Sequence, residues 1–262
     1  MSLVAEAPRV AAAGLGSPPP TQRAVRFPPR PSAFTWPETQ LGRSEVVEHL
    51  TSAPFAEGRA DLQRKRVVGV ELLVDWLSEQ AGGTWQQRWL GVEADLAGPA
   101  WAQVRNRWLA MRARRCAWHQ DLMAVGLRVA ISAEVIRPSF AWLVSGATGR
   151  GALVRMLATS RDPEGFARLR AHCQGDRDLS SWAQTHVAYR SALIMAAKGG
   201  TLADITVGDV IELFDAETAV WGKPSCGTTG FYRALLATGA LGEQAPPSLR
   251  HLRTAGRKPP SS

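Results

Sequence analysis

The sequence has few of the features that would fix its class at once. Its three cysteines, Cys116, Cys173 and Cys226, are an odd number at unrelated spacings. This usage is typical of free thiols in a reducing cytoplasm rather than of a disulfide framework. No apolar run approaches the roughly 18 residues that a membrane span needs. The first residues also lack the cationic start and apolar stretch of a signal peptide. We therefore expect a cytoplasmic protein with no membrane partner.

Acidic residues and lysine are scarce beside arginine. The 262 residues include 31 Lys and Arg against 23 Asp and Glu, which gives a formal net charge of +8. Only four of the basic residues are lysine. A positive excess of this size favours an anionic partner such as nucleic acid. A GC-rich genome produces the same arginine bias without any function, so charge alone shifts the interpretation only modestly.

No stretch has the alternating pattern of a β-strand, and nearly every segment after Leu41 has helical periodicity. The sequence predicts an all-α protein with a disordered, basic, Pro- and Ala-rich arm at 1–40. Two helical bundle units follow at 41–145 and 146–245, and a basic tail covers 246–262. We expect a hinge at Gly146–Gly151. The expected helices are 44–50, 57–79, 84–96, 99–118, 119–136, 162–173, 178–198, one that begins after Thr206, and 228–238.

Tryptophan is concentrated in one segment, residues 62–119, which holds six of the chain's ten. Within the expected helix 99–118, an i, i+3, i+7, i+10 spacing predicts one buried stripe of Trp101, Val104, Trp108 and Met111. Arginines border this stripe, and no acidic residue occurs between residues 96 and 118. The pattern indicates a compact helical module that faces a polyanion.

Two groups of cations in this segment are candidates for contacts with DNA phosphates. An alternative interpretation is that these side chains only solvate surface helices. The first group is Arg105, Arg107, Arg112, Arg114 and Arg115, and the second is Arg64, Lys65 and Arg66.

The string LLVDWLSEQAGGTWQQRWL at 72–90 resembles the N-terminal region of large site-specific integrases of high-GC bacteria. These are tyrosine recombinases carried on mobile elements. Residues 201–217 resemble the end of the SAM-like core-binding domain of that family, and 227–256 resemble its linker toward later domains. The resemblance implies that the second unit is SAM-like and that the helical bundles clamp double-stranded DNA.

By the same resemblance, the helix at 178–198 is a candidate for entry into a DNA groove, with Arg190 and Lys198 as contacts. Other recombinase subunits are then possible partners. The family's catalytic residues lie in a separate C-terminal domain.

The catalytic boxes of that family are absent from this sequence. Tyr189 and Tyr232 are the chain's two tyrosines, and both fall inside expected helices. No His-x-x-Arg occurs, and the arginine expected after the Leu-Leu-x-Thr-Gly-like string at 234–239 is missing. The resemblance therefore implies a truncated, DNA-binding portion of an integrase, without catalytic residues, cofactor or small-molecule substrate.

Two other functions remain open: a helical adaptor that docks a protein through an exposed tryptophan seam, and a non-functional remnant. A metal site is not expected, because Cys116 and His119 would need two more ligands and only the adjacent pair His172-Cys173 is a candidate. The acidic residues near the second unit's end are expected to line a solvated helix face. They are Asp204, Asp209, Glu212, Asp215 and Glu217.

Overall fold

The computed structural model describes residues 42–52, 60–96, 99–111, 117–146, 150–177, 181–222, 227–241 and 245. This described part consists of helices and connecting turns and contains no β-strand, so the predicted all-α fold is confirmed. The predicted arm at 1–40 and tail at 246–262 lie outside it. None of the described helices combines the length and apolar character needed to cross a membrane.

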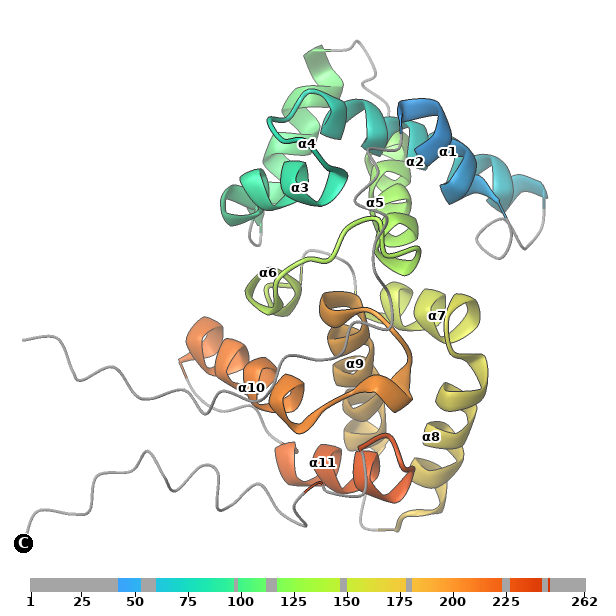
Figure 1. Cartoon of the computed structure of the whole chain (residues 1–262), viewed down its shortest axis with the longest axis vertical. Coiled ribbons are helices and arrows are strands. Elements are labelled where there is room, and N and C mark those ends of the chain that lie inside the picture. The colour runs from blue at the N-terminus through green and yellow to red at the C-terminus, as the bar shows by residue number, and fades with distance from the viewer. Residues whose placement is uncertain are drawn as a thin grey trace, which may run out of the picture.

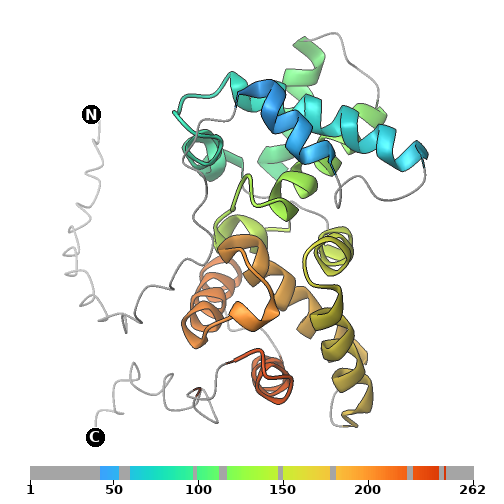
Figure 2. The same cartoon turned by 45° about the vertical axis from the view of Figure 1, so that its right-hand side comes forward.

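The described helices form two groups at opposite ends of the molecule (Figure 1). The first group comprises α1 (Arg43–Thr51), α2 (Ala60–Ser78), α3 (Trp85–Glu93), the 3-10 helix η1 (Ala94–Leu96), α4 (Pro99–Met111) and α5 (Ala117–Ser132). The second comprises α6 (Phe140–Val144), α7 (Arg150–Ser160), α8 (Pro163–Gly175), α9 (Ser181–Lys198), the 3-10 helix η2 (Leu202–Asp204), α10 (Val207–Trp221) and α11 (Thr228–Ala237). The groups meet where α5 lies next to α7 (Figure 2).

Local capping explains why several helices start where the sequence predicts. The hydroxyl of Thr84 accepts a hydrogen bond from the Gln87 N–H at 3.1 Å, and the Gln87 side chain accepts one from the Thr84 N–H at 3.1 Å. Thr206 and Asp209 form the same reciprocal pair at the start of α10. Each pair satisfies two backbone donors that a helix start leaves without an intrahelical acceptor.

The first group is organised around the crossing of α2 and α5, where two glycines allow the backbones to touch. A Cβ atom at Gly126 would overlap the carbonyl oxygen of Gly69, and a Cβ at Gly69 would overlap the carbonyl oxygen of Leu122. No side chain fits between the helices at this point. The crossing thus depends on these two residues having no side chain.

Beside this crossing, indole rings pack edge to face. Trp101 lies 5.4 Å from Trp76 and 6.4 Å from Trp89, and Trp89 lies 4.9 Å from Trp142 of α6, measured between ring centroids. Such pairs add to the free energy gained by burying the rings. The indole N–H of Trp142 donates to the Leu96 carbonyl at 3.0 Å, so α6 also contacts the first group by a hydrogen bond.

The predicted stripe on α4 is buried only in part. Trp101 and Trp108 are buried, but Met111 is 71% exposed, so its place in the stripe was wrong. Met111 is the last residue of α4. Leu109, the residue after Trp108 in the sequence, is buried in the core. The buried face of α4 therefore ends at Leu109, before the position that the periodicity predicts.

The helices α6 and α7 were not predicted. Residues 147–149 of the expected hinge lie outside the described part, and α7 begins at Arg150. The helix α6 packs mainly against α9 and α10. Its residues belong to the predicted first unit at 41–145, so the second group begins earlier in the chain than residue 146.

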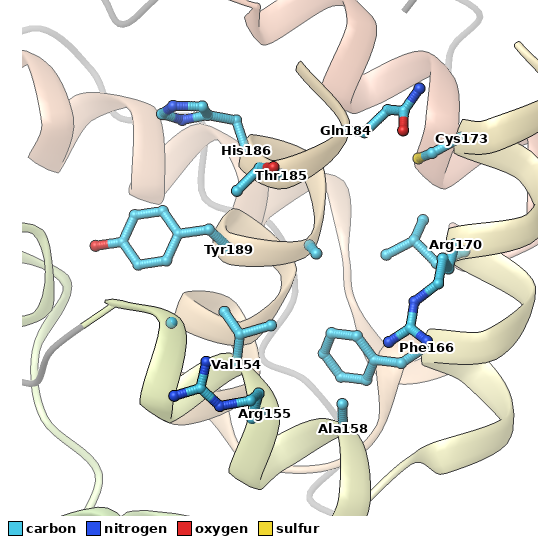
Figure 3. A pocket seen from close by; sticks show the side chains of 13 residues that line it. Val154, Arg155, Ala158, Phe166, Arg170, Cys173, Gln184, Thr185, His186 and Tyr189 are labelled. Atoms are coloured by element: carbon cyan, nitrogen blue, oxygen red, sulfur yellow. The ribbon is translucent and has the colours of Figure 1, made fainter. Parts of the chain in front are cut away.

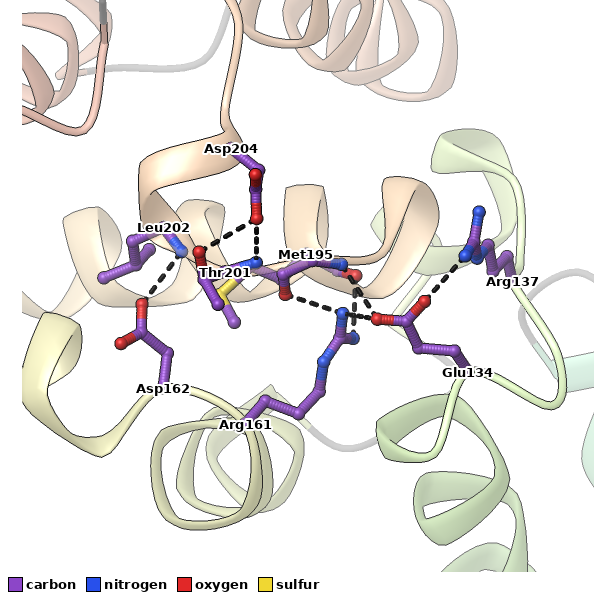
Figure 4. A network of polar contacts seen from close by, with 9 residues as sticks. Glu134, Arg137, Arg161, Asp162, Met195, Thr201, Leu202 and Asp204 are labelled. Carbon is purple, nitrogen blue, oxygen red and sulfur yellow. Dashed lines mark hydrogen bonds and ion pairs between the residues drawn. The ribbon is translucent and has the colours of Figure 1, made fainter. Parts of the chain in front are cut away.

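A buried polar network joins the two groups (Figure 4). Glu134, which follows α5 with a left-handed φ of 61°, accepts hydrogen bonds from Arg161, from Arg137 at 2.6 Å and from the Gly200 N–H at 2.8 Å. Arg161 also donates to the carbonyls of Met195, at 3.0 Å, and Gly200, at 2.7 Å. One carboxylate thus connects the end of α5 with residues that follow α7 and α9.

The core of the second group contains an ion pair. Arg190 of α9 donates from Nε and Nη2 to both carboxylate oxygens of Glu217 of α10, at 3.0 and 3.1 Å. The side chains are 0% and 2% exposed. The guanidinium carbon lies 5.4 Å from the Phe214 ring and 5.8 Å from the Phe231 ring. The bidentate geometry offsets part of the desolvation cost of the two charges.

This ion pair and the caps overturn most of the predicted solvated acidic face. Glu217 and Asp209 are buried, and Asp204 is partly buried with its carboxylate accepting a hydrogen bond from the Thr201 N–H at 2.7 Å. Glu212 and Asp215 are exposed, as expected. The prediction was wrong for Asp204 and Asp209 because each closes a capping box, and for Glu217 because it pairs with Arg190.

Candidate nucleic-acid interface

A shallow groove of about 270 Å³ lies between α2, α5 and α7. Four basic side chains from the three helices line it: Lys65 and Arg66 of α2, Arg128 of α5 and Arg155 of α7. Leu62, Val125 and Met156 supply apolar surface between them. The groove occurs where the two helix groups meet, so it exists only when α7 packs on α5.

The charged side chains described in the groove lining are all positive. Its described lining includes no Asp or Glu. Neither Lys65 nor Arg155 forms an ion pair with any carboxylate of the described chain. Guanidinium groups keep their charge at all physiological pH values. Four like charges held around one depression attract a polyanion more strongly than the same charges scattered over a surface.

The predicted candidates are distributed unevenly around this groove. Lys65 and Arg66 line it, whereas Arg64 is exposed on the same helix without lining it. On α4, Arg107 is exposed, and Arg105 is partly buried with its Nε donating to the Asn106 side chain at 3.3 Å. Neither of these lines the groove. The other three candidates, Arg112, Arg114 and Arg115, lie outside the described residues.

The two candidates on α9 are engaged within the protein. Arg190 has no exposed surface and is held by Glu217, so its guanidinium has no access to a phosphate in this conformation. Lys198 forms an ion pair with Glu212 at 2.5 Å and lies 5.3 Å from the Phe140 ring. Arg190 therefore has a structural role in this conformation, whereas contact between Lys198 and DNA stays a prediction.

Sequence reasoning missed Arg128 and Arg155. Arg128 lies inside the predicted helix 119–136, where a single arginine between Leu127 and Val129 carries no pattern of its own. Arg155 lies on α7, a helix that was not predicted because the glycine-rich string Gly146–Gly151 indicates a hinge. A signal was present: Leu153 and Leu157 are four residues apart, and both are completely buried.

The two tyrosines and Cys173 are buried. Tyr189 and Tyr232 are 4% and 3% exposed. Desolvation raises the pKa of Tyr232, which keeps its phenol protonated. Burial, followed by the charge of Asp176, raises the pKa of the Cys173 thiol. The described residues contain no cluster of three or more His, Cys, Asp and Glu side chains that could hold a metal ion.

Comparisons with known proteins do not identify the chain. No family model matches it, and neither the curated proteins nor the solved structures include a significant match.

Proposed function

We propose that this chain binds double-stranded DNA through the groove between α2, α5 and α7. The observation that carries the proposal is the convergence of Lys65, Arg66, Arg128 and Arg155 around a described lining without carboxylates. In keeping with the integrase-like sequence, the chain would act as the DNA-binding portion of a site-specific tyrosine recombinase, without strand-cleavage chemistry of its own.

Phosphate contacts are the interaction that this geometry favours. Arginine forms paired hydrogen bonds with phosphate oxygens, and lysine supplies a mobile point charge. Such contacts fix the position of a protein on a duplex but do not read its sequence. The groove residues would therefore hold the duplex, and any base recognition would come from other parts of the chain.

The buried tryptophans argue against the adaptor alternative. Among the described tryptophans of segment 62–119, none is more than 8% exposed. These are Trp76, Trp85, Trp89, Trp101 and Trp108. An adaptor that docks its partner through an indole surface needs that surface to be accessible, whereas a DNA-binding module needs the indoles only as a core.

The proposal is tested by the salt dependence of duplex binding. The variant Lys65→Gln/Arg66→Gln/Arg128→Gln/Arg155→Gln removes the four groove charges together. Each neutralised phosphate contributes about −0.9 to the slope of log K against log salt. We expect the slope measured for the variant to be shallower by about 3 to 4 than that of the parent chain. We also expect the variant to lose most of its affinity for the duplex at low salt.

A matched control removes four cations that lie elsewhere, with the variant Arg43→Gln/Arg168→Gln/Arg177→Gln/Arg233→Gln. Three of these are already in ion pairs on the surface, and their loss should cost little stability. If both variants weaken binding equally, net charge rather than the groove is responsible. A further variant, Arg105→Gln/Arg107→Gln, tests the predicted patch on α4 separately.

The recombinase part of the proposal has its own test. Sequencing the DNA next to the gene would reveal, in any reading frame, whether Arg, His-x-x-Arg and Tyr boxes of a catalytic domain follow. Their absence would leave a DNA-binding protein unrelated to strand exchange.

A further inference from the structure

A second and larger cavity, of about 630 Å³, lies between α7, α8 and α9. Its apolar part is formed by residues such as Val154, Ala158, Phe166 and Leu169. This volume lies within the usual range for small-molecule sites, which is roughly 300 to 1,000 Å³. The cavity is therefore large enough for a small-molecule ligand.

The formally charged side chains described in the lining of this cavity are both arginines. Arg155 of α7 and Arg170 of α8 lie on either side of Phe166, and Gln184 and His186 lie on the α9 side (Figure 3). The described lining contains no Asp or Glu. Neither Arg155 nor Arg170 is paired with a carboxylate of the described chain. Two guanidinium groups beside an apolar lining favour a ligand that combines an apolar body with a negative charge.

We propose that this cavity binds a small planar aromatic anion, with its ring against the partly exposed Val154 and Ala158 and its carboxylate or phosphate held by Arg155 and Arg170. An aromatic acid and a mononucleotide share this chemistry. The two arginines would supply charge-assisted hydrogen bonds, and the apolar lining would exclude water from the ring.

Arg155 also lines the cationic groove, so the two sites share one side chain. A bound anion that engages Arg155 would compete with a DNA phosphate for the same guanidinium. This consequence rests on the proposed DNA binding, whereas the ligand site itself does not. Saturating ligand should then reduce the salt slope of duplex binding by about 1, the share of one phosphate contact.

The experiment titrates the whole chain, without DNA, by isothermal calorimetry. The probes are two matched pairs, indole-3-acetate with indole-3-acetamide and AMP with adenosine. Each pair differs mainly in its negative charge. We expect at least one anion to bind with a dissociation constant below about 0.5 mM, which is ordinary for a ligand of this size. Its neutral counterpart should bind at least tenfold more weakly. Tighter binding of AMP assigns the site to nucleotides, and tighter binding of indole-3-acetate assigns it to aromatic acids.

Three variants locate the binding. Arg170→Gln should weaken the anion about tenfold and leave the neutral probe unchanged, because Arg170 is exposed and lines only this cavity. Ala158→Phe should abolish binding by filling the cavity. Lys65→Gln, which changes the groove alone, should have no effect.

Equal binding of the charged and neutral probes would overturn the proposal. So would wild-type affinity in Arg170→Gln, or the absence of binding heat for both anions up to about 2 mM, fourfold above the expected ceiling. Because the titration contains no DNA, a failure of DNA binding leaves these outcomes unaffected. The two proposals can thus fail independently.

Discussion

The two helix groups differ in whether arginine enters the core. In the first group the interior is made of indole rings and a glycine crossing, and the cations of α2 stand at its surface. In the second group Arg190 is completely buried against Glu217, and the Arg161 side chain, only 7% exposed, is held by Glu134 at the junction. A count of positive charges therefore overstates the charge available to a polyanion. Only the structure separates arginines that stabilise the fold from those that can meet a partner.

The largest expected effect comes from breaking the buried pair. Glu217→Leu leaves the Arg190 guanidinium charged, desolvated and without its carboxylate. Removing one partner of such a pair costs about 3 to 5 kcal/mol of unfolding free energy. Urea denaturation followed by circular dichroism measures this loss.

The control replaces both partners. Arg190→Met/Glu217→Leu exchanges two charges for apolar side chains of similar size, and we expect its stability to lie within about 1 to 2 kcal/mol of the parent chain. If the double variant is as unstable as the single one, packing rather than charge is responsible, and the contrast between the groups disappears.

The sequence predicts the surroundings of these pairs better than the pairs themselves. Helix type, the caps at Thr84 and Thr206 and most of the tryptophan core follow from local spacing. Each buried pair, however, joins residues 27 positions apart, a separation unrelated to any helical repeat. The groove is similar, because its four cations come from three helices, one of which was not predicted. Tertiary packing creates these contacts, and a local pattern does not contain them.

The second prediction concerns the glycine crossing of the first group. Gly126→Ala would place a methyl group where the Gly69 carbonyl oxygen lies, so α2 and α5 must move apart. We expect a loss of about 3 kcal/mol, at the upper end for overpacking, because the obstacle is backbone and cannot rotate away. The melting temperature and urea midpoint report the change.

A glycine within a helix but away from any crossing provides the control. A Cβ at Gly91 of α3 meets nothing closer than 3.7 Å. Gly91→Ala should therefore stabilise the chain by about 0.5 to 1 kcal/mol through helix propensity. Similar losses in both variants would show that the close approach at Gly126 does not limit the fold.

The third prediction tests the junction between the groups. Glu134→Gln keeps the side-chain shape but weakens its bonds to Arg161 and Arg137 and leaves a largely buried cation without its counter-charge. We expect a loss of about 2 kcal/mol, and faster hydrogen exchange at the Gly200 N–H, which Glu134 holds at 2.8 Å. Arg137→Gln should cost less than about 1 kcal/mol, because its side chain is 26% exposed. A Glu134→Gln effect no larger than this would mean that the network does not hold the groups together.

The smallest expected effect lies at the edge of the tryptophan core. The indole N–H of Trp108 donates to the Glu79 carboxylate at 2.7 Å, and Glu79 is exposed. Glu79→Ala should cost about 1 kcal/mol, the net value of one hydrogen bond whose acceptor is solvated after unfolding. Glu79→Gln keeps an acceptor in place and should cost half of that or less. Paired urea midpoints distinguish the two variants. Glu217→Leu removes a buried charge, whereas Glu79→Ala removes an exposed one. If Glu79→Ala lowers the free energy of unfolding nearly as much as Glu217→Leu, the first group also relies on a desolvated ionic contact.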